Sequence, residues 1–134
     1  MKMNKFFVFL LTASMMVFVS CGNDDNEEDF RDAYVGSYMG DCAYHYSNGS
    51  DYQFDTVYNN ESLSVSKNAD NGLTIDFRNM TFSVQCTKDG EIPVSSYNPH
   101  SNCFGRFKGD SLYFEYNDVS QGNASSLSFN GRKK

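Results

Sequence analysis

The residues of this chain best suited to covalent or metal chemistry are four cysteines and two histidines. A catalytic cysteine needs a neighbouring base, and neither His45 nor His100 lies in a recognisable nucleophile motif. Zinc sites usually contain a Cys-x-x-Cys pair or closely spaced histidines, and the sequence has neither. We therefore expect no enzyme activity, no metal and no cofactor.

Carboxylates are numerous enough to form acid–base pairs by chance. Asp41, Asp76, Asp110 and Glu115 are candidates, but a chain with 17 acids offers many such combinations. Solvated strand faces and turns explain all four positions.

Two short segments match the Asp-Ser/Thr-apolar O-glycosylation motif of exported Bacteroidota proteins. They are Asp55-Thr56-Val57 and Asp110-Ser111-Leu112, with Thr56 and Ser111 as the acceptors. Asp110 and Ser111 also suit a hairpin turn, so the motif and the turn remain alternatives there.

Aromatic side chains are the remaining candidate binding groups. Tyr44 and Tyr46 share one strand face, Tyr52, Phe54 and Tyr58 share another, and Tyr97 lies in a long connection. Rings that point inward would form the core, whereas rings that point outward would form a platform for a sugar or peptide. The core is favoured, because an eight-stranded barrel is just wide enough for side chains or one small ligand.

The N-terminus has the pattern of an export signal. Lys2 and Lys5 precede an apolar run at 6–19, and the small residue Ser20 comes directly before Cys21. A membrane-spanning helix needs about 20 apolar residues, so this run is too short for a simple anchor. We expect a signal peptide at 1–20.

The segment Phe18-Val19-Ser20-Cys21 resembles the bacterial lipobox, in which the cysteine becomes the lipidated first residue of the mature chain. The resemblance implies that Cys21 is a membrane tether. Each buried CH₂ of an acyl chain contributes roughly 0.8 kcal/mol, so several chains give lasting attachment.

An acidic segment follows Cys21, and we expect 21–33 to be a flexible tether. Its like charges repel and extend the chain; the acids are Asp24, Asp25, Glu27, Glu28, Asp29 and Asp32. The segment resembles the acidic lipoprotein export signal of Bacteroidota, which implies an outer-membrane protein facing the cell surface. The periplasmic face is the alternative.

Composition limits the function of the remaining chain. A net charge of -6 disfavours nucleic-acid binding, which usually needs a basic face. Twelve Phe and nine Tyr give too many burial anchors for a disordered chain. We expect one domain at 34–134 and a monomer.

Alternation of apolar and polar residues predicts an all-β domain from Tyr34 onward. Asn, Asp and Gly residues that suit hairpin turns fall between most of the segments. The predicted strands, eight or nine in number, are 35–40, 43–47, 51–58, 61–66, 72–77, 80–87, 103–108, 111–117 and 124–131. Closing this meander would remove its exposed edges, so we expect a small up-and-down antiparallel barrel, with a two-sheet sandwich as the alternative.

Three cysteines, Cys42, Cys86 and Cys103, would remain in the mature domain in an oxidising compartment. A Cys86–Cys103 disulfide would close the connection 87–102, which holds both prolines, and would contribute roughly 3 kcal/mol. Pairing of Cys42 with either partner, or no bond at all, stays open.

The domain resembles the calycin-like or lipocalin-like lipoproteins of Bacteroidota. The segments that carry the resemblance are Tyr34-Val35-Gly36-Ser37-Tyr38, 62–67, 107–112 and 129–133. Lipocalins pack a late Arg against the Trp of a Gly-x-Trp motif, and the resemblance implies Gly36, Tyr38 and Arg132 for these positions.

These observations favour a surface-tethered binding module that takes a small or extended ligand at one barrel mouth. Tyr44, Tyr46, Tyr97 and His100 are the candidate ligand-facing residues. The alternative is an interaction or inhibitor protein that acts through its outer surface.

Overall fold

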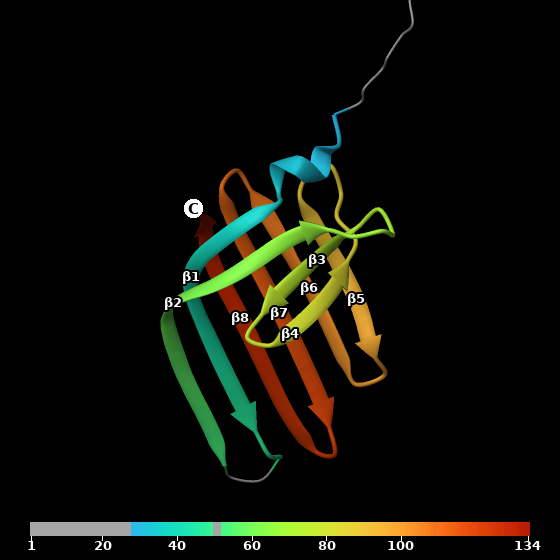
Figure 1. Ribbon diagram of the computed structural model, residues 1–134. Helices are drawn as coiled ribbons and strands as arrows, with labels where there is room; N and C mark the ends of the chain where they lie inside the picture. Colours follow the sequence, from blue (N-terminus) through green and yellow to red (C-terminus); the bar gives the residue numbers. More distant parts are fainter. Residues whose placement is uncertain (1–27, 50–51) are drawn as a thin grey trace, which may run out of the picture.

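The computed structural model describes residues 28–49 and 52–134, which form one antiparallel sheet of eight strands (Figure 1). The strand order is β4-β3-β2-β1-β8-β7-β6-β5. The strands are β1 (Gly36–Ser47), β2 (Gln53–Lys67), β3 (Leu73–Phe77), β4 (Met80–Val84), β5 (Glu91–Asn98), β6 (Ser101–Lys108), β7 (Ser111–Ser120) and β8 (Asn123–Lys133). The sheet curves into a nearly closed barrel, which confirms the predicted all-β meander. Within the described part of the chain, no helix has the length and apolarity to cross a membrane.

Two pairs of predicted strands are single long strands. The predicted break before residue 61 is a β-bulge, because the register slips by one residue between Gly40 and Cys42 of β1, and Asn60 has a φ of 60°. A bulge bends a strand without ending its ladder. At the same level a Cβ on Gly40 would stand 2.1 Å from the Asn130 carbonyl oxygen, so only glycine permits the close approach of β1 to β8.

The connection 87–102 was expected to be a loop but contains the strand β5. Pro93 has no backbone N–H and is tolerated because β5 pairs only with β6. The pairing register also shifts between Ile92 and Ser95 and again between Ser96 and Asn98. The proline and the two bulges remove the alternation by which the other strands were predicted.

The short hairpin of β3 and β4 lies over one half of the barrel (Figure 1), and most of the buried side chains belong to this half. Arg78 and Asn79, both at positive φ, make the tight reversal between these two strands. The buried core side chains of this half are Tyr38, Leu63, Val65, Leu73, Ile75, Phe77, Phe82, Val84, Phe107, Leu112, Phe114 and Phe129. We call this half, with the turns above it, the closed end.

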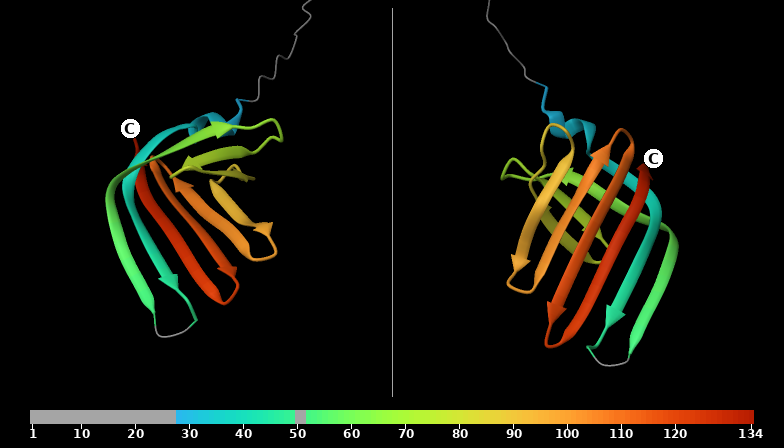
Figure 2. Two further views of the ribbon diagram at one scale, coloured as in Figure 1. Left: turned by 60° about the horizontal axis from the view of Figure 1, so that its bottom comes forward. Right: turned by 180° about the vertical axis from the view of Figure 1, so that it is seen from behind.

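The N-terminal segment covers the closed end (Figure 2). A 3-10 turn, η2 (Phe30–Ala33), leads into Tyr34, whose ring stacks on Phe107 with centroids 4.6 Å apart. The Tyr34 hydroxyl donates to the Lys88 carbonyl at 2.7 Å, and the Tyr38 hydroxyl donates to the Tyr34 carbonyl at 2.8 Å. The last residues of the predicted tether are therefore packed on the barrel.

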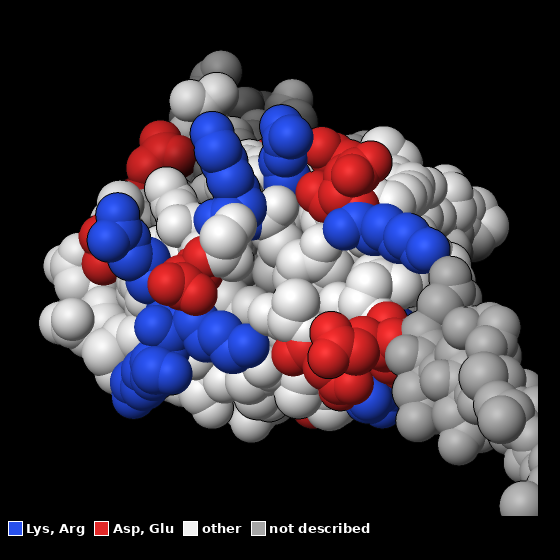
Figure 3. All heavy atoms as spheres, turned by 90° about the horizontal axis from the view of Figure 1, so that it is seen from above, with Lys and Arg blue, Asp and Glu red and all other residues white. Residues whose placement is uncertain are grey.

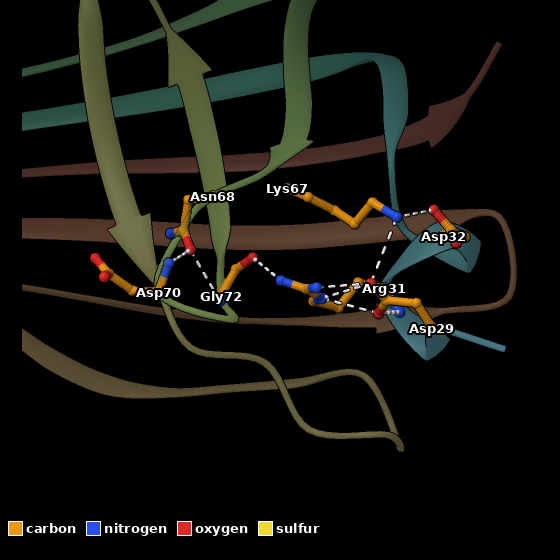
Figure 4. A network of polar contacts seen from close by, with 7 residues as sticks. All are labelled: Asp29, Arg31, Asp32, Lys67, Asn68, Asp70 and Gly72. Carbon is orange, nitrogen blue, oxygen red and sulfur yellow. Dashed lines mark hydrogen bonds and ion pairs between the residues drawn. The ribbon is translucent and has the colours of Figure 1, made fainter. Parts of the chain in front are cut away.

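Lysines and arginines are interspersed with acids across the closed end (Figure 3). Arg31 binds Asp29 through two nitrogens, and Lys67 reaches Asp32 at 2.5 Å (Figure 4). The Arg31 guanidinium holds the pKa of Asp29 far below its ordinary range. Arg31 also donates to the Gly72 carbonyl at 3.3 Å, which ties η2 to the β2–β3 turn. Two of the six acids of the predicted tether thus hold it against the barrel.

The lipocalin resemblance implied that Arg132 packs against Tyr38, and the structure places Arg132 elsewhere. Arg132 pairs in register with Met39 and is exposed on the outer face. Lys133 instead pairs with Tyr38 and shares its inner face, and its Nζ donates to the Ala33 carbonyl at 3.0 Å. Lys133, and not Arg132, therefore lies beside Tyr38 on the inner face.

Candidate functional site

The candidate site is the half of the inner face that the β3–β4 hairpin does not cover. β3 and β4 have five residues each, whereas β1 has 12 and β2 has 15. β3 therefore pairs only with residues 64–67 of β2, and β1, β2, β7 and β8 extend well beyond the hairpin (Figure 2). In this second half, the open half, the β1–β2 side of the inner face has no strand of the hairpin above it, whereas Ser101, Cys103 and Leu127 on the other strands remain buried.

Strand alternation places a group of aromatic side chains on this inner face. Cys42 is fully buried in the core, so Tyr44 and Tyr46, two and four residues further along β1, point the same way. Their neighbours on β2 point inward as well, because cross-strand partners share a face. We define the aromatic face as Tyr44, Tyr46, Tyr52, Phe54, Tyr58 and Tyr116.

Three of these rings, Tyr52, Phe54 and Tyr58, are exposed to solvent, and the other three are half-buried. Tyr44 lies 6.4 Å from Phe54 and Tyr46 lies 6.3 Å from Tyr52, centroid to centroid. Tyr52 is 56% exposed, Phe54 43% and Tyr58 36%, while Tyr38, further up β1 on the same face, is 0% exposed. The rings therefore point inward, as the predicted core would, yet they form an accessible platform.

Arg78 marks the boundary between the packed core and the aromatic face. Its guanidinium lies 3.8 Å from the centroid of the Tyr58 ring and donates two hydrogen bonds of 3.1 Å to Glu61. The ion pair raises the pKa of Arg78 and lowers that of Glu61. Arg78 is therefore a fixed charge that fastens the β3–β4 turn to β2.

Polar groups continue the inner face across the neighbouring strands. Ser125 of β8 pairs in register with Tyr46 on one side and with Asp118 of β7 on the other, and Asp118 pairs with Ser101 of β6. Ser101 is 3% exposed, and its Oγ has no hydrogen-bond partner in the described part of the protein. One row of register partners across the sheet thus runs from the Tyr46 ring to the Asp118 carboxylate and the Ser101 hydroxyl.

Of the predicted ligand-facing residues, Tyr44 and Tyr46 lie on the aromatic face and the other two lie further along the sheet. Tyr97 belongs to β5, where its hydroxyl donates to the Thr81 carbonyl of β4 at 2.5 Å and its ring contacts Phe82. It therefore joins the two edges of the barrel. His100 lies in the β5–β6 turn, where its backbone N–H donates to Asn98 Oδ1 at 2.7 Å.

The predicted glycosylation positions fall at opposite ends of the barrel. Thr56 pairs with Tyr44 on the inner face and is half-buried, so a glycan there would lie on the aromatic face. Ser111 begins β7 at the closed end and is also half-buried. The predicted lipidation residue, Cys21, lies outside the described residues.

A second arrangement, which the sequence did not suggest, lies on the outer face of β1, β2 and β8. His45 Nδ1 hydrogen-bonds Asp55, and Ser126 pairs with His45 from the other side, beside a hollow of about 320 Å³. An Asp-His-Ser series of this kind could activate the serine hydroxyl as a nucleophile. Acyl transfer also needs amide N–H groups that stabilise an oxyanion. β1 pairs with a strand on both of its edges, so its amides are engaged in the sheet.

The carboxylates considered for acid–base chemistry are not brought together. Asp76 accepts a hydrogen bond from Thr81 at 2.6 Å, and Glu115 accepts one from the Tyr113 hydroxyl. The Glu115 carboxylate raises the pKa of Tyr113 to about 12. Asp110 lies in the β6–β7 turn, whereas Asp41 lies on β1. Among the residues that the structure describes, no group of three or more His, Cys, Asp or Glu could hold a metal ion.

The three cysteines of the domain are free thiols in the structure. Cys103 is buried on the inner face, in register with Ser95 and Tyr116, while Cys86 follows β4 at the closed end. The segment between Cys86 and Cys103 is an ordered strand rather than a loose connection. Burial raises the pKa of all three thiols, that of Cys86 to about 11.

We predict slow alkylation of Cys86 that accelerates with pH. A pKa about two units above the ordinary value of 9.0 leaves roughly 100-fold less thiolate at pH 8 than a free thiol has. Iodoacetamide labelling followed by peptide mass spectrometry should show a rate that rises about tenfold per unit up to pH 10. A plateau below pH 9.5 would contradict the raised pKa, and labelling that requires a reductant would show that Cys86 is in a disulfide.

Comparisons of the chain with protein-family models, with curated proteins and with solved structures find no match.

Proposed function

We propose that this protein is a lipid-anchored binding module of the bacterial cell envelope, which takes its ligand on the aromatic face. The observation that carries the proposal is the exposure of Tyr52, Phe54 and Tyr58 on the inner side of the sheet. Soluble proteins seldom expose contiguous aromatic surface unless it binds something. Tyrosine and phenylalanine offer large, rigid contact areas at a low entropic cost.

The position of the tether supports this orientation. The chain enters the described structure at the closed end, and the open half lies at the other end of the strands (Figure 2). Seven residues lie between Cys21 and Asp29, and the eight steps from one to the other span at most roughly 28 Å of extended chain. With Cys21 lipidated, the closed end would lie near the membrane and the aromatic face would point away from it. We place the protein on the outer membrane facing the cell surface, in keeping with the acidic segment after Cys21.

The outer face offers the second candidate function, an interaction or inhibitor module. The hollow beside His45 and Asp55 favours it, because this hollow is lined by the small side chains Ala43, Ser126 and Ser128. A partner loop that inserts there would leave the aromatic face free.

Lipid anchoring is tested by replacing Cys21 with Ser. The wild-type chain should label with a fatty-acid analogue and remain in the membrane fraction, and Cys21→Ser should lose both properties, because the thiol is the attachment point. Cys86→Ser is the matched control and should behave as wild type. Labelling that persists in Cys21→Ser would contradict the anchor.

Ligand binding is tested on the full-length protein in non-ionic detergent, with four probes of equal length immobilised on a sensor. The probes are a neutral tetrasaccharide, tetraserine, tetralysine and tetraglutamate. We expect at least one to bind, and a Tyr46→Ser/Phe54→Ser variant to bind it at least tenfold more weakly, because ring contacts contribute much of such affinity.

The control variant is Tyr113→Ser, since Tyr113 is 40% exposed on the outer face, close to the 43% of Phe54. It should leave binding unchanged. If Tyr113→Ser or a substitution in the outer hollow, such as Ala43→Arg, abolished binding while Tyr46→Ser/Phe54→Ser did not, the interaction module would replace the present proposal.

A further inference from the structure

We propose that the ligand of the aromatic face is an extended peptide segment bearing lysine or arginine, and that Tyr46 and Asp118 together bind its positive charge. This inference rests on the proposed function and adds the chemical class of the ligand.

The first observation is the distribution of charge along the barrel. In the open half, which comprises residues 43–57, 94–104 and 115–128, the described residues include no lysine or arginine. Its described acids are Asp55 and Glu115 on the outer face and Asp118 on the inner face, and among the described residues only two histidines could carry positive charge. The basic residues lie at the closed end, where acids lie among them (Figure 3), or in the Arg78–Glu61 pair. The open half therefore attracts a cation and repels an anion.

The second observation is the row that joins a ring to a carboxylate. Tyr46 and Asp118 are both register partners of Ser125, so one strand separates them on the same inner face. Neighbouring strands lie about 4.8 Å apart, which puts their backbones roughly 10 Å apart across the concave sheet. Between them stands only the small side chain of Ser125. That spacing leaves room for an ammonium or guanidinium group between the two side chains.

Two further groups in the same region suit such a ligand. Ser101, next to Asp118 in register, has a buried hydroxyl without a partner among the described residues, and it could accept an N–H donor. Tyr58 already packs against a guanidinium, that of Arg78, at 3.8 Å. The rings of this face are thus compatible with cation–π contact, although Arg78 itself is committed to Glu61.

The free edge of β2 indicates that the cation is carried by a peptide. β3 pairs only with residues 64–67, so the edge of β2 from Gln53 to Ser62 faces no strand in the described structure. From Gln53 to Tyr58 this edge holds no lysine, proline or bulge, the features that commonly protect a strand edge, and the bulge at Asn60 lies beyond it. An extended peptide could pair with it through its backbone while its side chains reach the aromatic face.

The test compares tetralysine with spermine, which carries about the same charge of +4 but has no peptide backbone. Binding to the full-length protein in non-ionic detergent is measured for wild type, Asp118→Asn and Asp110→Asn. Asp110 is the matched control, since it loses the same charge at the closed end. We expect Asp118→Asn to weaken tetralysine binding about tenfold, Asp110→Asn less than twofold, and spermine to bind at least tenfold more weakly than tetralysine. Added salt should weaken binding of both cations.

The outcomes separate this inference from the proposed function. If the neutral tetrasaccharide or tetraserine binds through Tyr46 and Phe54 and tetralysine does not, the binding function stands and the cationic ligand is wrong. If Asp118→Asn and Asp110→Asn weaken tetralysine equally, the charge effect is general and the Asp118 site is wrong. If spermine binds as tightly as tetralysine, the proposal that the ligand is a peptide is wrong. If no probe responds to Tyr46→Ser/Phe54→Ser, both proposals fail.

Discussion

The short β3–β4 hairpin determines which part of the inner face is core and which part is surface. Two five-residue strands cover about half the length of β1 and β2, and the side chains beneath them are fully buried. Beyond the turn at Arg78 and Asn79, β1 and β2 continue, and in the described structure no strand of the hairpin lies above their inner side chains. One sheet therefore provides a packed core at one end and an exposed aromatic surface at the other.

The closed end shows how the chain stabilises so small a core. Tyr34 stacks on Phe107, and Arg31 links η2 to the β2–β3 turn through the Gly72 carbonyl. No ladder joins β4 and β5, the two edge strands of the described sheet. The Tyr97 hydroxyl connects them by a hydrogen bond to the Thr81 carbonyl. These contacts place the tether at the end opposite the aromatic face, which is the arrangement that an anchored binding module needs.

Much of the fold could be predicted from the sequence, because alternation and turn residues are local signals. The exceptions have physical causes. Pro93 and two bulges hide the strand β5, and Asn60 at positive φ resembles a turn although the ladder continues through it. The lipid anchor and the membrane side remain predictions, because they depend on residues outside the described structure.

The candidate site was predicted only in part, because it depends on which side chains the β3–β4 hairpin covers as well as on the direction in which they point. For Tyr44 and Tyr46 the sequence posed a choice between inward core and outward platform, but the rings point inward and are half-buried beside the exposed rings of Tyr52 and Phe54. Their exposure follows from the length of a hairpin far along the chain. Asp118 and Ser125 join the site through the β7–β8 register, which places them in the row of Tyr46.

The central claim, that the inner face is open beyond the hairpin, is tested most directly by nitrating the tyrosines of the folded protein with tetranitromethane. Peptide mass spectrometry would compare Tyr52, which is 56% exposed, with Tyr38, which is 0% exposed on the same inner side. Tyr113 on the outer face, 40% exposed, is the reference for an accessible ring. We expect Tyr52 to react at least as fast as Tyr113 and Tyr38 to react only on unfolding. Protection of Tyr52 to the level of Tyr38 would show that the face is covered and would contradict the account.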